Sequence, residues 1–199
     1  MDQRRTLLVL RHGQTEDVRP GSKDSERRLT PDGERHALEV GDYLRAEGIM
    51  VDTVLCSSAA RARQTLELLK LGDQLNPDRV EIADRFYNAG GDTLINAIRE
   101  LPEDCRVALL IGHAPGAPGL VHEMTDPATS TPEAVSAIES RFPAAALAQL
   151  EFEGDWSEID GGSLVSVRMP GSDGHCPPSS RLAQSPPAVV IFNTTTRPK

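Results

Sequence analysis

Two histidines that follow short apolar runs are the residues best suited to chemistry in this sequence of 199 residues. The run 6–10 leads into an Arg-His-Gly tripeptide that holds His12, and the run 107–111 leads into a Gly-His pair that holds His113. Short runs rich in Leu and Val and stopped by glycine are typical of interior strands of a parallel sheet. Because the carboxyl ends of such strands share one edge, where open α/β sheets bind ligands, we expect both imidazoles to face one crevice. The structural alternatives are that His12 caps a carbonyl group and that His113 closes a turn.

An arginine near a predicted helix start adds a third element. A short strand precedes Ser57 and Ser58, which offer hydroxyl caps for a helix over about 59–72. Arg61 lies in the first turn of that helix, where a cation opposes the helix dipole unless an anion is bound. Backbone N–H groups, dipole and guanidinium would all favour a phosphate there. The sequence therefore predicts an anion site at Arg61; the alternative of a solvated helix residue suits Arg63 better.

Four segments together resemble the histidine phosphatase superfamily, also called the phosphoglycerate mutase-like superfamily. In chain order they are LLVLRHGQTE, RLTPDGERHA, VLCSSAARARQT and LLIGHAPG. The resemblance covers about residues 5–125. It implies a phosphoglycerate mutase-like α/β fold, a three-layer α/β/α sandwich around a mostly parallel sheet.

The branch of that superfamily is indicated by what the sequence has and lacks. Mutase-like members place a Trp and an Asn after the first motif, where this chain has Asp17 and Val18, and they carry an acidic residue in a Trp-Glu-Gly context that is missing from residues 85–94. The short length, the Leu-Thr-x-x-Gly segment and Tyr87-Asn88-Ala89 resemble the SixA-type phosphohistidine phosphatases. The resemblance implies hydrolysis of phosphohistidine in a phosphorylated protein, with a small phosphomonoester as the alternative substrate.

The resemblance also implies a role for each matching residue. His12 would attack phosphorus through one ring nitrogen and form a phosphohistidine enzyme, while a backbone carbonyl holds its other nitrogen. Arg11 and Arg61 would grip the non-bridging oxygens. His113, preferably protonated, would be a further donor. The substrate contacts would be completed by Gly13, through close approach of its backbone, and by the hydroxyl of Thr15.

The proton donor for the leaving group is not identified by the motifs. Phosphoryl transfer from an alcohol oxygen calls for a general acid, which contributes about 100- to 10,000-fold. The candidates are Glu16 and Asp92, and the alternative for Asp92 is a structural one, the N-cap of a helix over 93–101. Because imidazole leaves more readily than an alkoxide, the missing acid favours a phosphohistidine substrate. The same gap motivates a second hypothesis, a phospho-ligand binding module with little turnover.

The composition and net charge limit the classes of partner that the protein can bind. The formal net charge of −9 excludes a general nucleic-acid or membrane-surface role, which would call for a basic face. No apolar run approaches the roughly 18 residues of a membrane span. Three cysteines without a C-x-x-C pair, and a polar start, predict a cytoplasmic protein without a disulfide framework. The histidines form no metal pattern, so we expect no metal or cofactor, and the oligomeric state is not determined by the sequence.

Strands alternate with helices along the chain, which predicts a mostly parallel sheet with helices on both faces. Helices are expected over 31–48, 59–72, 93–101, 116–124 and 132–140, and strands over 6–10, 51–56, 80–83, 107–111, 145–152 and 164–168. We expect one histidine phosphatase domain over 1–169. The Pro- and Ser-rich segment 170–199 is predicted to be a mostly disordered tail, in which 188–192 could add to a sheet edge.

Overall fold

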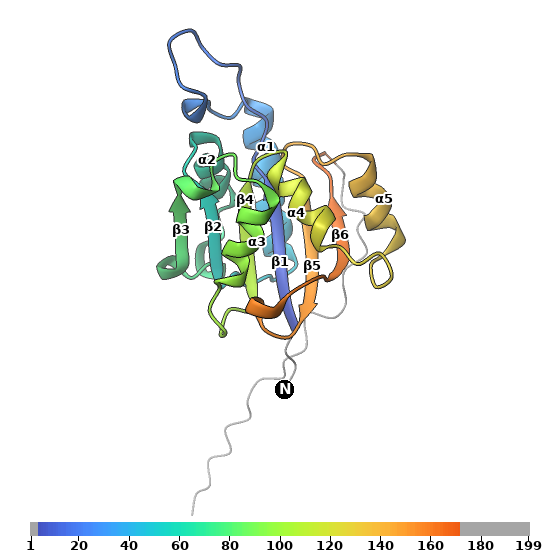
Figure 1. Cartoon of the computed structure of the whole chain (residues 1–199). Helices are drawn as coiled ribbons and strands as arrows, with labels where there is room; N and C mark the ends of the chain where they lie inside the picture. The colour runs from blue at the N-terminus through green and yellow to red at the C-terminus, as the bar shows by residue number, and fades with distance from the viewer. Residues whose placement is uncertain (1–3, 172–199) are drawn as a thin grey trace, which may run out of the picture.

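The computed structural model describes residues 4–171 and places one six-stranded sheet between helices (Figure 1). The strands are β1 (Arg4–Arg11), β2 (Thr53–Ser57), β3 (Val80–Ala83), β4 (Val107–Gly112), β5 (Leu147–Glu153) and β6 (Ser163–Arg168). The helices are α1 (Pro31–Ala46), α2 (Ala60–Leu69), α3 (Gly91–Arg99), α4 (Gly116–Met124) and α5 (Pro132–Ser140). Two short 3₁₀ turns matter below, η1 (Asp24–Glu26) and η4 (Asp84–Phe86). Every expected helix and strand of this range is present, with ends that differ by a few residues.

The strand order brings the two histidine-bearing strands together. The order is β3-β2-β4-β1-β5-β6, and β1, β2, β3 and β4 pair in parallel while β5 runs antiparallel to both of its neighbours. In the β1–β4 pair, Arg11 lies opposite Gly112. His12 and His113 therefore follow at the same level of the same edge, and the amide of His12 donates to the carbonyl of Gly112 at 3.1 Å. The expectation of a mostly parallel sheet with both imidazoles at one edge is confirmed.

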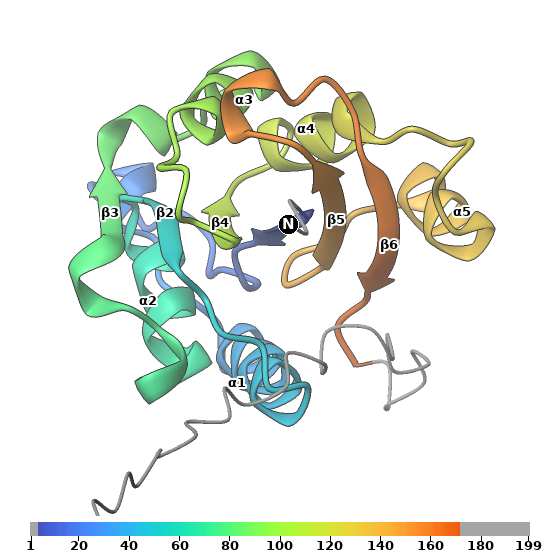
Figure 2. The ribbon, with the colours of Figure 1, turned by 90° about the horizontal axis from the view of Figure 1, so that it is seen from below.

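Helices cover both faces of the sheet, which gives the three layers expected (Figure 2). Helices α1 and α2 lie on one face, and α3 and α4 lie on the other. Alternate residues of β1 serve the two cores: Leu8 and Leu10 pack with α1 and α2, while Leu7 and Val9 pack with α3 and α4. Each of these side chains is fully buried, which stabilises the fold by about 1.5–3 kcal/mol per residue. The end of β1, where His12 lies, is thus held rigidly from both sides.

Helix starts show where side-chain capping was predicted correctly and where it was not. Thr30 caps α1 as expected, since its hydroxyl accepts a hydrogen bond from the amide of Gly33 at 3.0 Å. The predicted serine caps of α2 are wrong: its N-cap is Ala59, without a side-chain cap, because the hydroxyl of Ser57 contacts His113 and that of Ser58 bonds to Asp84.

The structural alternative for Asp92 is also wrong, because the N-cap of α3 is Gly90. The helix begins at Gly91, so Asp92 lies inside its first turn. A carboxylate there still interacts favourably with the helix dipole without capping it.

The predicted tail, apart from Pro170 and Gly171, lies outside the described residues, as does the segment 188–192. The division into a domain over 1–169 and a tail remains a prediction. Within residues 4–171, no helix combines the length and the apolar character needed to cross a membrane.

Helices α1 and α2 touch through a glycine. A Cβ atom on Gly41 of α1 would lie only 2.1 Å from the carbonyl oxygen of Leu69, at the end of α2. Backbone atoms cannot move aside as a flexible side chain can, so a methyl group here must push the two helices apart. Because α2 carries Arg61, this contact helps to hold that arginine at the edge of the sheet.

We predict that Gly41→Ala lowers the free energy of unfolding by about 1–3 kcal/mol, the usual cost of overpacking. Gly119→Ala in α4 is the matched control, because a Cβ atom added there would meet no atom within 4 Å. That change should stabilise the protein by about 0.5–1 kcal/mol through helix propensity. Urea denaturation of both variants measures the difference, and equal effects would contradict the role given to the α1–α2 contact.

Candidate active site

Strands β1 and β4 and helix α2 bring His12, His113 and Arg61 into contact. All three side chains are buried, and the two imidazole centroids lie 4.9 Å apart. The Nε of Arg61 donates to Nε2 of His12 and to Nδ1 of His113, both at 3.2 Å. These residues line a pocket of about 340 Å³ together with Arg11, Thr15, Asp24, Arg27, Asn88 and Ala114.

His12 is held in the tautomer that a nucleophile needs. Its Nδ1 lies 2.7 Å from the carbonyl oxygen of Gly13, and its Nε2 accepts from Arg61. The proton therefore sits on Nδ1, and Nε2 is unprotonated, with its lone pair accepting from Arg61. Burial, together with the nearby cations Arg61 and Arg11, lowers the pKa of His12 to about 4, against the raising effect of the Gly13 carbonyl. The backbone carbonyl expected to hold this ring is that of Gly13.

His113 is neutral, contrary to the expectation that it is protonated. Burial, followed by the proximity of His12 and Arg61, lowers its pKa to about 3. Its Nδ1 accepts from Arg61, and its Nε2 lies 2.7 Å from the hydroxyl of Ser57. The proton of this ring therefore belongs on Nε2, and Ser57 fixes its orientation. The physical reason is that burial disfavours the charged form of the ring, and the nearby Arg61 disfavours it further.

Arg11 brings a second guanidinium to the pocket. Its Nη1 donates to the carbonyl of Phe142 at 2.9 Å, while its Nε is buried without an acceptor in the described part of the chain. Burial lowers the pKa of Arg11, although a guanidinium stays charged at any physiological pH. An unpaired buried donor costs about 1–3 kcal/mol, which an anionic oxygen entering the pocket would offset.

Asp24 lines the pocket and Tyr87 contacts it, and sequence reasoning gave neither residue a role at the site. The Nη1 of Arg61 donates to the backbone carbonyl of Asp24 at 2.8 Å, and its Nη2 donates to Oδ2 of the same residue at 3.0 Å. The hydroxyl of Tyr87 donates to Oδ2 as well, at 2.8 Å. The Tyr87 bond, with help from Arg27 and Arg61, lowers the pKa of Asp24 to about 2, so the carboxylate is ionised. The Asp24 carboxylate therefore balances the charge of Arg61, whereas the anion predicted there was a bound phosphate.

Arg27 joins Asp24 to the first motif. Its Nη1 donates to Oδ1 of Asp24 at 3.2 Å, its Nη2 donates to the hydroxyl of Thr15, and its Nε donates to the carbonyl of Glu16 at 2.8 Å. Thr15 thus lies at the pocket as predicted, with its oxygen engaged by Arg27. The position just ahead of the Leu-Thr-x-x-Gly segment was the available sequence signal for Arg27, but residue type alone did not distinguish it from its neighbour Arg28.

Asn88 completes the pocket wall. It has a φ of +50°, a left-handed conformation that asparagine tolerates better than most residues. Asn88 thus lines the pocket, and its neighbour Tyr87 donates a hydrogen bond to Asp24.

The comparisons with known proteins agree with this geometry. The family model of the histidine phosphatase superfamily (branch 1) matches residues 7–89. The phosphohistidine phosphatase SixA of Escherichia coli K12 is 31% identical over 137 residues, which is 67% of this chain and 83% of that protein. This chain belongs to the histidine phosphatase superfamily.

Solved structures place it in the SixA-type branch of the superfamily. A Nakamurella multipartitia protein assigned as a phosphohistidine phosphatase SixA matches with a TM-score of 0.74 at 31% identity, over 85% of this chain and 98% of that one. The protein histidine phosphatase SixA complexed with tungstate matches with a TM-score of 0.64 at 25% identity, over 81% of this chain and 95% of that one. The resemblance seen in the four sequence segments is confirmed.

Three residues expected to contact the substrate or to donate its proton do not line the pocket, although the carbonyl of Gly13 holds the His12 ring. Gly13 serves packing, since a Cβ atom there would lie 2.7 Å from the carbonyl oxygen of Gly33, and its amide donates to Thr65 rather than facing a ligand. Glu16 pairs with Arg19 at 2.6 Å, outside the pocket lining. Asp92 lines a separate groove beside α3 and α4. Neither expected proton donor reaches His12.

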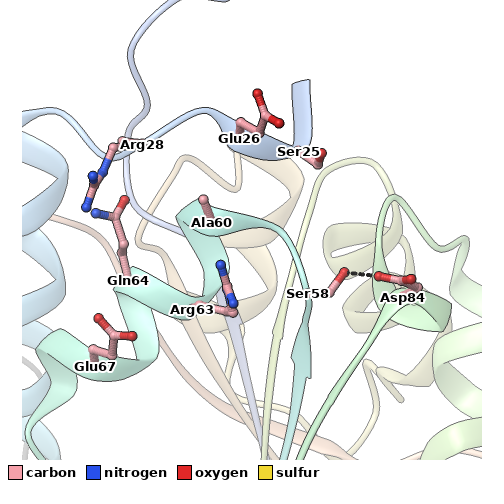
Figure 3. Close-up of a pocket in the computed structure, with 9 residues that line it drawn as sticks. All are labelled: Ser25, Glu26, Arg28, Ser58, Ala60, Arg63, Gln64, Glu67 and Asp84. Carbon is pink, nitrogen blue, oxygen red and sulfur yellow. Dashed lines mark hydrogen bonds between the residues drawn. The ribbon is translucent and has the colours of Figure 1, made fainter. Parts of the chain in front are cut away.

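A second hollow of about 570 Å³ lies on the other side of the segment 24–28 (Figure 3). Its walls carry both charges, with Arg28 and Arg63 against Glu26, Glu67 and Asp84. Arg63 is exposed there, as expected for a solvated residue. The segment thus lines two hollows, with Asp24 at the pocket that holds His12 and Glu26 at this outer hollow.

We predict that both imidazoles stay neutral far below the usual histidine pKa of about 6.5. In phosphate-free protein, long-range ¹H–¹⁵N spectra should show midpoints near pH 4 for His12 and near pH 3 for His113. Because the unfolded chain binds protons that the folded chain refuses, the free energy of unfolding should fall as pH drops from about 6.5 toward 4. A His12 midpoint near 6.5 in the folded protein would contradict the neutral nucleophile.

Proposed function

We propose that this chain is a SixA-type phosphatase that hydrolyses phosphohistidine in a protein through a phosphoenzyme at His12. The observation that carries the proposal is the neutral, carbonyl-anchored imidazole of His12, whose Nε2 lies beside two buried groups, Arg61 and His113. Membership of the superfamily and similarity to SixA proteins support phosphatase activity.

In the first step, Nε2 of His12 attacks phosphorus in line with the bond to the substrate nitrogen. The new N–P bond forms as the old one breaks, and its electron pair leaves with the substrate imidazole. Positive charge grows on the His12 ring, where the Nδ1 hydrogen bond to Gly13 stabilises it. The transition state of phosphoryl transfer is loose, and the phosphoryl oxygens carry strong negative charge. The guanidinium groups of Arg11 and Arg61 therefore contribute by positioning and charge stabilisation.

In the second step, water attacks the phosphorus of phosphorylated His12. The N–P bond breaks, its electron pair returns to Nε2, and inorganic phosphate leaves. One proton of the water stays with phosphate and the other passes to solvent, so the histidine regains its starting protonation state. The carbonyl of Gly13 keeps the Nδ1 proton in place throughout.

The nature of the acid groups at the pocket favours phosphohistidine over an alcohol phosphate. Among the described residues that line the pocket, Asp24 has the only carboxyl group, and its lowered pKa leaves it ionised and unable to donate a proton near neutrality. An alkoxide would leave poorly from such a site, whereas an imidazole does not need a strong acid. A small phosphomonoester with a good leaving group is the alternative substrate within the same chemistry.

We predict that incubation with a ³²P-phosphohistidine peptide leaves an acid-labile, alkali-stable label on the wild-type protein and none on His12→Asn. The wild type should also release inorganic phosphate, and the variant should lose at least about 1,000-fold of that rate, since a nucleophile cannot be replaced by its neighbours.

His122→Asn is the matched control for this experiment. His122 lies exposed in α4, outside the pocket lining, so its replacement should leave labelling and turnover unchanged. If the wild type binds phosphate tightly but is never labelled and never turns over, the chain is a binding module instead.

A further inference from the structure

The pocket geometry leads to an inference about substrate selectivity, which rests on the proposed function. We infer that Asp24 is a specificity-determining residue that accepts the ring N–H of a phosphohistidine substrate and so keeps that substrate in its imidazolium form. The proton that an alcohol leaving group would need from the enzyme is then already on the substrate.

Asp24 has the position and the free acceptor capacity for this contact. It lines the pocket with His12 and Arg61, and its side chain remains 40% exposed. Its carboxylate accepts from Arg61, Arg27 and Tyr87. A carboxylate offers about four lone-pair sites, so one acceptor position is left for a ligand.

A carboxylate is a liability in a pocket that binds a phosphoryl group. The negative charges of Asp24 and of a phosphomonoester dianion repel each other, and the dianion has no donor group that Asp24 could bind. Phosphohistidine differs, because its ring has a second nitrogen that can carry a proton and a positive charge. The same pocket can therefore grip the phosphoryl oxygens with Arg11 and Arg61 while Asp24 binds the cationic ring.

The ring proton decides how easily the substrate leaves. When the protonated ring departs, the N–P bond breaks, its electron pair stays on the ring nitrogen, and neutral imidazole is released. When the unprotonated ring departs, the product is imidazolate, a far stronger base. A hydrogen bond from the ring N–H to an ionised carboxylate raises the pKa of that N–H in the complex. Asp24 thereby replaces the general acid that Glu16 and Asp92 do not supply.

None of the described groups that face Asp24 titrates near neutrality, so the substrate ring is the group whose protonation changes there. Arg27 faces it from its own segment, Arg61 from α2, Tyr87 from the loop after η4, and His113 from the end of β4. The arginines stay charged, and the phenol pKa of Tyr87 is raised. The histidine pKa is about 3, so this ring is neutral. Turnover of phosphohistidine should therefore fall as pH rises through the pKa of the bound ring.

The test compares Asp24→Asn with wild type on two substrates, a phosphohistidine peptide and p-nitrophenyl phosphate, whose leaving group needs no proton. We expect kcat/KM for the peptide to fall by about 10- to 100-fold, the value of a charge-assisted hydrogen bond. For p-nitrophenyl phosphate, whose leaving group has no ring N–H for Asp24 to bind, the loss should be clearly smaller, so that the ratio of the two kcat/KM values changes. The alkaline limb of kcat for the peptide should also move to lower pH in the variant.

Glu26→Gln is the matched control, because it removes the same charge from the same 3₁₀ turn at a residue that lines the outer hollow and not the pocket of His12. It should leave both substrates unchanged. Equal losses on both substrates for Asp24→Asn would show a purely structural carboxylate and overturn the inference, as would equal gains, which would mark Asp24 as a simple competitor of phosphate. A wild type that hydrolyses p-nitrophenyl phosphate but not the peptide would overturn the proposed substrate as well.

Discussion

The site depends on one buried guanidinium, that of Arg61, and on the constraint that its charge must be matched. Its Nε joins the two imidazoles, and its terminal nitrogens bind Asp24. A buried cation in the first turn of a helix is unfavourable by itself, since burial and the helix dipole both oppose it. The structure resolves this with an ionised carboxylate from a different segment. Burial, supported by the charge of Arg61, keeps His12 and His113 neutral, as the proposed nucleophilic role of His12 requires.

The fold supplies this arrangement from elements far apart in the sequence. The parallel pairing of β1 with β4 sets His12 beside His113, and the next strand, β2, leads into α2 and Arg61. The segment between β1 and α1 then rises over the carboxyl edge of the sheet and brings Asp24 to the pocket (Figure 1). The sheet therefore fixes the catalytic groups, and a loop provides the group that we infer reads the substrate, a common division in α/β proteins.

The sequence predicted the sheet, its helices and the meeting of His12, His113 and Arg61, because these follow from hydrophobic period and from the shared edge of parallel strands. It did not predict Asp24 or Tyr87, since loop residues are placed by three-dimensional contacts that leave no period in the sequence. The capping roles first given to Ser57 and Asp92 were assigned from local rules, and the substrate contact first given to Gly13 was implied by the family resemblance. In the structure Ser57 contacts His113 and Gly13 packs against Gly33. Helix α3 begins at Gly91, so Asp92 lies inside it.

The proposed mechanism requires that an anion enters this pocket with His12 Nε2 in line for attack. A crystal structure with vanadate, which mimics the phosphoryl group in the transition state of transfer, tests this requirement most directly. We expect a five-coordinate vanadium bonded to Nε2 of His12, with its equatorial oxygens bound by Arg11 and Arg61. Vanadate bound in the outer hollow beside Arg63, or bound in the pocket with Nε2 of His12 turned away from the metal, would contradict the mechanism.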